Sequence, residues 1–412
     1  MKRMLFALFA VFFLTGILPL FARGSQNQTT SAQKVKIQYT CWGNANEKAT
    51  EEAIVAKFME LNPDIEVEYI HVDGNYSDKI LLMIAGSEAP DVMAAGTGLI
   101  PNILPALTPL DNARIDRSKY ASSLFLERLV YEGKQYALPK RVSTKVIVYN
   151  KDLLARAGIA APGNRYSIDQ FTSDAQTITT KLGIYASDPL WFGQWVFQFG
   201  GAMMSTDGTP IFNNATGKQA AQYIVDSTTR YKFAPPAIEM EGQDAMQWFI
   251  SQKVAFKCDF GAFYLPLMAQ VKGFDWDIAP APGNGGEMEL VGIAVSSTTR
   301  HPEAALRFVE FFSNSKEAQD IIASTTSLPV ITESKAAFIA QYPDKNLQAF
   351  FDAMQDQGIS PTFKGSSQIG GILFGHLLQR TPLGAAGTED VGIVLDDAAR
   401  DVRTALAEAA RQ

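Results

Sequence analysis

The residue types that carry out covalent or metal-dependent chemistry do not form a known catalytic motif in this sequence. The three histidines, His71, His301 and His376, are scattered, and none belongs to an HExxH zinc motif. Ser31-Ala32-Gln33-Lys34 fits an SxxK pattern but lacks the companion S-D-N and K-T-G motifs. We therefore predict no enzyme activity, no cofactor and no metal. The 43 acidic residues still leave room for a carboxylate pair suited to glycoside hydrolysis, so a secreted enzyme stays as an alternative.

The two cysteines, Cys41 and Cys258, lie far apart in the sequence. Two such residues cannot form a disulfide framework or a four-ligand zinc site. We expect two small buried thiols, because unpaired cysteine is among the most buried residue types. A single bridge between them stays open, since sequence does not supply its geometry.

Length and charge limit the class of protein. A chain of 412 residues exceeds what one hydrophobic core fills, so two domains are expected. Its apolar fraction of 47% and charged fraction of 19% are those of an ordinary globular protein. The net charge is −7 and no stripe of Lys and Arg offsets it, which argues against a nucleic-acid partner.

The first 22 residues have the order of a secretory signal peptide. A short basic start, Met1-Lys2-Arg3, precedes an apolar run from Met4 to Phe21, and the polar segment 23–33 follows. We predict that 1–22 is removed after export. An uncleaved anchor is the alternative, because the apolar run is near the length that spans a bilayer. No cysteine follows before Cys41, so no lipid acceptor is expected, and the location is periplasmic or otherwise extracytoplasmic.

The chain after the leader alternates strands with helices. Alternating apolar residues predict strands over 35–39 and 65–69, a 3.6-residue period predicts helices that end at Leu61 and Gly86, and a further short strand begins at Pro90. This β-α-β-α-β order indicates an α/β fold with a mostly parallel sheet covered by helices.

Several segments, in order along the chain, resemble a known family. The most specific runs from Val146 to Ile159 and reads Val-Ile-Val-Tyr-Asn-Lys-Asp-Leu-Leu-Ala-Arg-Ala-Gly-Ile. The other matching segments are 58–67, 79–92, 207–213 and 301–311. On these residues the chain resembles the family 1 extracellular solute-binding proteins of bacterial carbohydrate ABC importers, the group that includes maltose-binding protein.

The resemblance implies a hinged, type II-like clamp of two α/β lobes with mixed, mostly parallel sheets flanked by helices. Lobe 1 would hold residues 34–142 and 296–342, and lobe 2 would hold 145–292 and 345–412. Two or three chain crossings would form the hinge, near Ser143 and Gly292. Ligands of open α/β sheets bind beyond the carboxyl ends of the strands, so the crevice between the lobes is the expected site.

The first lobe supplies five candidate ligand-binding residues. Trp42 follows the first strand and offers a ring face, with a place in the core as the alternative. Asn44 begins the next helix, where it could simply cap the helix. Thr97 lies in the loop where the family's first lobe contacts ligand. Arg141 and Ser143 lie at the implied hinge entry, where Arg141 could instead form an ion pair between the lobes.

The second lobe supplies four more. The segment that begins at Asp188 resembles the family's acidic-Pro-aromatic loop, which implies that Asp188 accepts hydrogen bonds from ligand hydroxyls and that Trp191 stacks on the ligand. Phe263 and Tyr264 occupy the place of the family's stacking aromatic. A sugar has flat C–H faces and hydroxyls that cost about 1–3 kcal/mol each if buried without a partner, so rings and polar groups together suit a carbohydrate.

The expected function follows from the resemblance. We predict a monomer that captures a mono- or oligosaccharide, performs no chemistry on it, and delivers it to the transmembrane subunits of an ABC permease. A second alternative keeps the clamp but passes the bound form to a signalling receptor.

Overall fold

The computed structural model describes residues 34–411 except 241, 284, 326 and 385–386. The predicted signal peptide, 1–22, and the polar segment, 23–33, lie outside the described residues. The chain from Lys34 onward forms one compact unit. Within the described part, none of the helices combines the length and the apolar character needed to cross a bilayer.

A five-stranded mixed sheet contains the first strands of the chain. Its strands, in spatial order, are β2 (Ile65–His71), β1 (Val35–Cys41), β3 (Val92–Gly96), β12 (Glu289–Val295) and β6 (Leu138–Ser143). β1 is parallel to β2 and β3, and the helices between them supply the crossovers that parallel pairing requires. β12 is antiparallel to β3 and β6. The predicted β-α-β-α-β order is therefore confirmed, but the sheet is mixed and not mostly parallel, because β12 lies antiparallel between β3 and β6.

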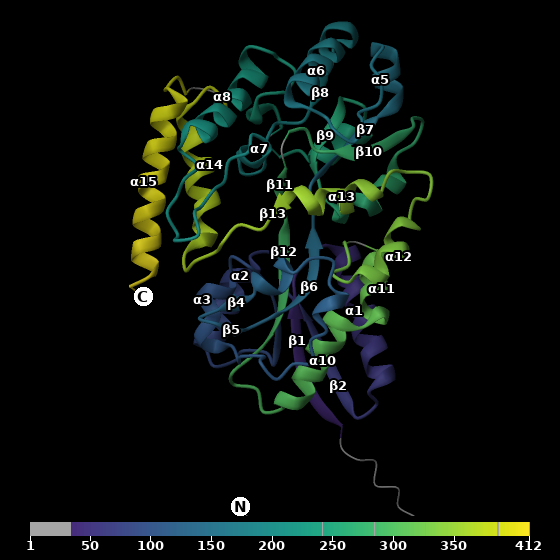
Figure 1. Ribbon diagram of the computed structural model, residues 1–412, viewed down its shortest axis with the longest axis vertical. Coiled ribbons are helices and arrows are strands. Elements are labelled where there is room, and N and C mark those ends of the chain that lie inside the picture. The colour runs from purple at the N-terminus through teal and green to yellow at the C-terminus, as the bar shows by residue number, and fades with distance from the viewer. Residues whose placement is uncertain (1–33, 241, 284, 326, 385–386, 412) are drawn as a thin grey trace, which may run out of the picture. The chain divides into compact units, whose positions relative to one another are not determined.

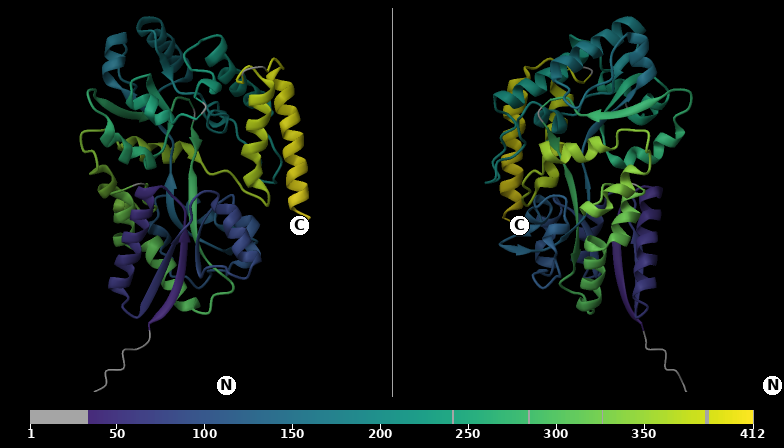
Figure 2. Two further views of the ribbon diagram at one scale, coloured as in Figure 1. Left: turned by 180° about the vertical axis from the view of Figure 1, so that it is seen from behind. Right: turned by 45° about the vertical axis from the view of Figure 1, so that its right-hand side comes forward.

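Helices cover both faces of this sheet (Figures 1 and 2). One face carries α1 (Ala45–Leu61), α10 (Pro302–Asn314) and α11 (Lys316–Ala323), and the other carries α2 (Tyr76–Ala85) and α3 (Ile100–Ile103). α10 begins with Pro302 in its first turn, as the sequence predicts, and buries Phe308 and Phe312 against the sheet.

A four-stranded sheet forms the second framework. Its strands, in spatial order, are β10 (Trp276–Pro280), β7 (Val146–Asn150), β9 (Val254–Phe260) and β8 (Tyr185–Ser187). The helices nearest to it in Figure 1 are α5 (Lys151–Ala157), α6 (Ile168–Leu182) and α13 (Gln348–Asp356). Asn150 caps α5 by accepting from the Leu153 amide, and Gly158 ends α5 in a left-handed conformation that favours glycine.

Four further helices pack beside the second sheet. They are α7 (Phe192–Gln198), α8 (Ala215–Thr229), α14 (Ile369–Arg380) and α15 (Val391–Ala409). Figures 1 and 2 show α14 and α15 side by side at the C-terminal end of the chain.

The chain passes between the sheets at several points. Thr144 and Lys145 join β6 to β7, and the buried Gln357 side chain holds this connection by bonding the backbone N–H and C=O of Lys145 at 3.0 and 2.6 Å. Strand pairing places all of β12, Glu289–Val295, in the first sheet, whereas the boundary drawn from sequence falls at residue 292.

Candidate functional site

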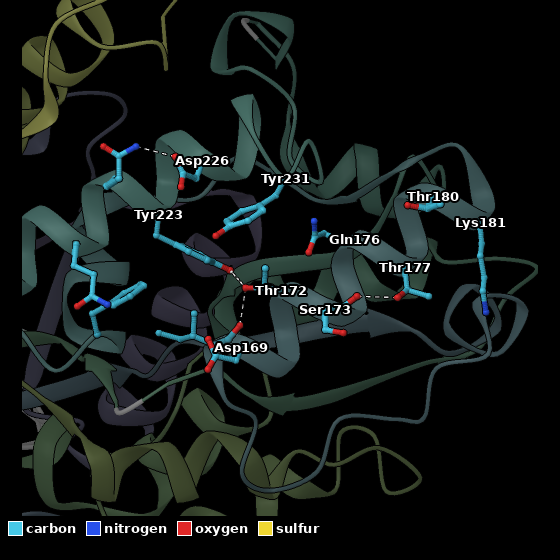
Figure 3. A pocket seen from close by; sticks show the side chains of 14 residues that line it. Asp169, Thr172, Ser173, Gln176, Thr177, Thr180, Lys181, Tyr223, Asp226 and Tyr231 are labelled. Carbon is cyan, nitrogen blue, oxygen red and sulfur yellow. Dashed lines mark hydrogen bonds between the residues drawn. The ribbon is translucent and has the colours of Figure 1, made fainter.

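A hollow of about 900 Å³ lies between α6 and α8 (Figure 3). Its walls are mainly hydroxyl and amide side chains on the exposed faces of these helices, together with Tyr223 and Tyr231. The Tyr223 hydroxyl already bonds Thr172 at 2.7 Å. None of the nine candidate residues lines this hollow, so it is a different surface from the predicted site.

Two smaller hollows meet at Trp42. The first, which we call the Arg141 hollow, measures about 250 Å³ and is lined by Trp42, Glu47, Arg141, Val142, Ser143, Phe263, Glu289, Val291 and Ser327. The second, the Tyr76 hollow, measures about 340 Å³ and is lined by Trp42, Gly74, Asn75, Tyr76, Ser77, Gly96, Gly98, Leu99 and Ser367.

Elements of both sheets form the Arg141 hollow. Trp42 comes directly after β1, and Arg141 and Ser143 belong to β6 of the same sheet. Phe263 comes from η4 (Ala262–Gln270), which follows β9 of the second sheet. The hollow therefore has a main wall on the first sheet and a second wall at Phe263, in the segment that follows the second sheet. Trp42 lies at the carboxyl end of β1, where ligands of open α/β sheets bind.

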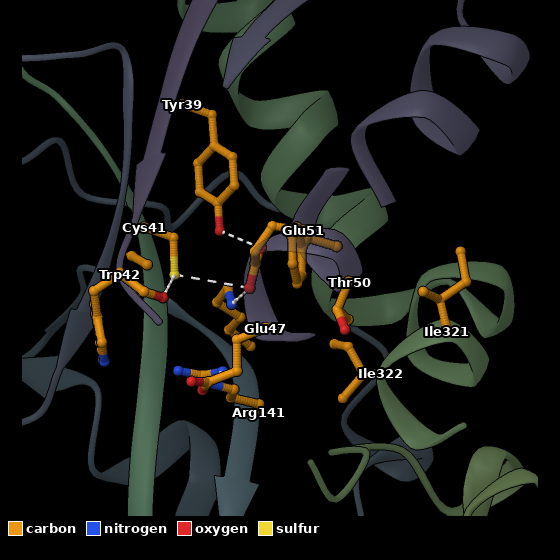
Figure 4. A network of polar contacts seen from close by, with 12 residues as sticks. Tyr39, Cys41, Trp42, Glu47, Thr50, Glu51, Arg141, Ile321 and Ile322 are labelled. Carbon is orange, nitrogen blue, oxygen red and sulfur yellow. Dashed lines mark hydrogen bonds and ion pairs between the residues drawn. The ribbon is translucent and has the colours of Figure 1, made fainter. Parts of the chain in front are cut away.

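A network of buried charges supports the Trp42 wall (Figure 4). Arg141 pairs with Glu47 at 2.7 Å, and its guanidinium lies 5.5 Å from the Trp42 ring centre. Behind this pair, Lys140 is fully buried and pairs with Glu51, which also accepts a hydrogen bond from the Tyr39 hydroxyl at 2.8 Å. Each buried charge thus has an opposite partner, which fixes the Arg141 guanidinium against the indole.

The two cysteines are free and buried, as predicted. Burial, reinforced by the Glu51 carboxylate, raises the pKa of Cys41 to about 11. Burial likewise raises the pKa of Cys258 well above its ordinary value. Both thiols are therefore protonated at neutral pH and unreactive.

The Phe263 ring lies beside a hydroxyl group of the first sheet. A side chain at Gly261 would approach the Phe263 ring to 2.5 Å and Ser143 Oγ to 3.0 Å, so glycine lets these two groups come together. Ser143 Oγ is buried and has no hydrogen-bond partner among the described residues. A buried hydroxyl of this kind is available to a polar group that enters the hollow.

Lys145 lies against the Phe263 ring. Its ammonium lies 5.2 Å from the Phe263 ring centre and 3.1 Å from Glu289. Burial alone would lower the pKa of Lys145, but the Glu289 and Asp259 carboxylates raise it, so Lys145 stays charged. The Glu289 side chain is 63% exposed, which leaves this carboxylate accessible from the hollow.

Asp188 lies outside the Arg141 hollow. It is buried, pairs with Lys257 at 2.9 Å and accepts a hydrogen bond from the Cys258 amide at 2.8 Å. Burial raises the pKa of Asp188, against the opposing charge of Lys257. Both carboxylate oxygens are thus occupied within the protein.

Trp191 lines a fourth hollow together with Asp188. Its ring is 40% exposed and lies 5.1 Å from that of Phe374 on α14. Trp191 and Asp188 are therefore brought together with each other, but not with Trp42, Arg141, Ser143 or Phe263.

The remaining candidates lie beside the two hollows that meet at Trp42. The Asn44 side-chain oxygen accepts from the amides of Asn46 and Glu47 at 2.9 and 3.1 Å, which is the capping role weighed from sequence. Thr97 lies between Gly96 and Gly98 of the Tyr76 hollow, and its carbonyl accepts from the Thr362 hydroxyl at 2.9 Å. The Tyr264 ring packs on Phe260, with ring centres 5.7 Å apart.

Several lining residues have no role in the sequence prediction. No motif marks Glu289 and Ser327, which line the Arg141 hollow. The same holds for Tyr76 and Ser367, which line the Tyr76 hollow from distant parts of the chain. Glu47 has a sequence signal, since it stands three residues after Asn44 in a capping box, but that signal does not reveal its pairing with Arg141.

Comparison with known proteins gives a family and a fold. The family model of the bacterial extracellular solute-binding proteins matches residues 42–319. An arabinooligosaccharide-binding protein of Bacillus subtilis is 24% identical over 328 residues, which is 73% of this chain and 75% of that protein. A maltodextrin-binding protein of the same organism is 24% identical over 314 residues, which is 69% of each.

Among solved structures, an ABC substrate-binding protein of Listeria monocytogenes in complex with cycloalternan is similar to this chain. Its TM-score is 0.81 at 22% identity, and the match covers 90% of this chain and 99% of that one. This likeness confirms the predicted α/β fold of two hinged lobes.

Proposed function

Because this chain belongs to the bacterial extracellular solute-binding proteins, we propose that it captures a mono- or oligosaccharide outside the cytoplasm and delivers it to the transmembrane subunits of an ABC importer. Its curated relatives include proteins named for arabinooligosaccharides and for maltodextrin. The single observation in this chain that supports a sugar ligand is the Arg141 hollow, where two aromatic rings face a set of polar groups across a space of about 250 Å³.

In this proposal the rings and the polar groups of the hollow meet different parts of the sugar. The rings of Trp42 and Phe263 stack on C–H faces, as amphipathic sugars require. Arg141 donates to ligand oxygens, and the unpartnered Ser143 Oγ exchanges a hydrogen bond with a hydroxyl. Thr97, beside the Tyr76 hollow, would meet a longer ligand that extends past Trp42.

Closure of the two lobes follows from a hollow that is lined by the first sheet and by Phe263, which follows the second sheet. A ligand that contacts both walls binds the closed form better than the open form, and only this difference in affinity moves the equilibrium. We assign the lobes to 34–142 with 296–342 and to 145–292 with 345–412, and strand pairing favours moving the second crossing, at 292–296, to a point before Glu289. The protein acts as a monomer and returns the sugar chemically unchanged.

Titration with sugars tests this proposal. Maltose, maltodextrins and arabinooligosaccharides are added to the purified protein while tryptophan emission and small-angle scattering are recorded. We expect a saturable change in emission with compaction for at least one neutral sugar, and recovery of that sugar intact. The carbohydrate assignment is wrong if no neutral sugar changes either signal, and cleavage of the sugar would instead support a carbohydrate-active enzyme.

A further inference from the structure

The hollow that contains Asp188 and Trp191 differs in chemistry from the Arg141 hollow. It has a volume of about 280 Å³ and lies between segment 188–193, α8 and α14. Its walls are mainly apolar and include Leu190, Ile224, Leu373 and Leu377. We call it the apolar pocket.

The apolar pocket offers almost nothing to a charged ligand. Among the described residues that line it, Asp188 carries the charged side chain and Thr228 a hydroxyl. Asp188 Oδ2 pairs with Lys257 at 2.9 Å and Oδ1 accepts from the Cys258 amide at 2.8 Å, so the carboxylate is already satisfied. A charged group in this pocket would lose its hydration without gaining a partner.

Two large rings stand at the edge of the pocket. Trp191 is 40% exposed and Phe374 is 41% exposed, and their planes are inclined by 49° with centres 5.1 Å apart. Both rings also line the pocket. Exposed aromatic surface next to an apolar hollow is the usual mark of a binding site rather than of a finished core.

The position of the Trp191 ring depends on Gly193. A side chain at Gly193 would lie 2.5 Å from the indole Nε1, which is too close for any contact. Because glycine has no side chain, the Trp191 indole can pack over the backbone at position 193, beside the pocket.

We propose that the apolar pocket binds an uncharged apolar group the size of one or two fused rings. Its volume is nearly twice that of the roughly 150 Å³ apolar cavity that holds benzene in an engineered protein. An uncharged apolar group fits this pocket. Among the described lining residues, the charged Asp188 side chain already has its partners and so cannot bind a charged ligand. The apolar pocket shares no lining residue with the Arg141 hollow, and its binding of an apolar group is proposed independently of the sugar assignment.

The apolar group can belong to a separate molecule or to one end of the transported ligand. α14 starts next to Ser367, which lines the Tyr76 hollow, and Phe374 follows roughly 10 Å along the helix at about 1.5 Å per residue. A glycoside with an apolar end could therefore reach from one site to the other.

Binding of 2-naphthol to the full chain tests the proposal by isothermal calorimetry and by quenching of tryptophan emission. We expect one saturable site, and affinity for the 2-naphthoate anion at least about tenfold weaker. Phe374→Ala and Gly193→Ala should each weaken 2-naphthol binding about tenfold, through loss of a ring contact and through displacement of the indole. Leu82→Ala, which changes an exposed apolar residue on α2, is the matched control and should leave it unchanged.

The results of these titrations decide whether the pocket binds an apolar group and which molecule carries that group. Absence of 2-naphthol binding to the folded protein, or equal affinity in wild type, Phe374→Ala and Gly193→Ala, would overturn the proposal. Because the probe contains no sugar, this result is independent of the carbohydrate titration. A naphthyl glucoside that binds more tightly than 2-naphthol would place the apolar group on the transported ligand, and equal affinity would assign the pocket to a separate molecule.

Discussion

The Arg141 hollow and the apolar pocket each place a tryptophan beside a buried ion pair, yet they offer opposite surfaces to a ligand. In the first, the Arg141–Glu47 pair forms part of the lining and faces Trp42. In the second, Lys257 pairs with Asp188 from within the protein, and the Cys258 amide occupies the other carboxylate oxygen. An acidic residue next to an aromatic ring therefore marks a polar site only when its ion pair keeps a donor or acceptor free for a ligand, and both carboxylate oxygens of Asp188 are occupied.

The largest effect is expected from breaking the pair beneath the apolar pocket. Lys257→Met leaves Asp188 charged and buried without a partner, which costs about 3–5 kcal/mol of unfolding free energy. Burial alone would lower the pKa of Lys257, but Asp188 and Asp259 raise it, so the native pair is charged. Urea unfolding followed by circular dichroism measures the loss.

Two controls accompany Lys257→Met. The double variant Lys257→Met with Asp188→Leu should recover most of the loss, because no uncompensated charge remains. Lys218→Met removes an exposed pair with Asp396 and should cost less than about 1 kcal/mol. Equal losses for Lys257→Met and Lys218→Met would show that the Asp188 pair is not the buried anchor described here.

The comparison predicts different roles for the two tryptophans. Trp42→Ala should weaken sugar binding by about 2 kcal/mol, or roughly 30-fold, because the ring stacks on the ligand. Trp191→Ala should change the affinity for an unmodified sugar by less than about threefold, since its ring lines the other pocket. Calorimetric titration of both variants tests this, and a larger effect at Trp191 would reverse the assignment.

Substitution of Asn44 distinguishes a helix-capping role from a contact with the ligand. Asn44→Ala should lower the unfolding free energy by about 1 kcal/mol through loss of the capping box, with sugar affinity changed less than about twofold. Asn44→Ser keeps a capping oxygen and should retain most of the stability. A large loss of affinity in Asn44→Ala at unchanged stability would place Asn44 in the binding site after all.

The smallest effect concerns Asp259, which lies between the two regions in a bulge of β9 and has a left-handed backbone with φ of 54°. Burial raises the pKa of Asp259, although the Lys145 and Lys257 charges oppose the rise. A carboxyl group with a raised folded pKa favours the folded state below the ordinary carboxyl range, near 4, and loses that contribution as pH rises through the folded value.

Asp259→Asn should therefore be slightly more stable than wild type at neutral pH and not at pH 3, a gain smaller than the loss at Asn44. Asparagine tolerates the left-handed backbone as well as aspartate does, so strain does not confuse the comparison. Asp396→Asn is the control of opposite sign, because hydrogen bonds from Lys218 and Asn213 lower the pKa of Asp396. Chemical unfolding across pH 3–8 measures both, and a pH-independent difference at Asp259 would contradict the burial of its charge.

Local sequence signals determined much of this protein. Alternation and helical periodicity located the first strands and helices, Asn44 and Gly158 marked a helix start and a helix end, and Pro302 opened α10. These features depend on neighbours within a few residues, which is why they could be predicted. The resemblance read from 146–159 led to the correct family.

Tertiary structure alone decided which side chains share a cavity. One hollow brings together Trp42, Arg141, Ser143 and Phe263. Asp188 instead forms an ion pair with Lys257, which lies 69 positions later and which no motif connects to it. A carboxylate can serve a ligand only if the fold leaves it without a closer partner, and burial and pairing are set by contacts between distant segments. For this reason the sequence identified the candidate residues, and only the packing of the two sheets divided them between a polar hollow and an apolar one.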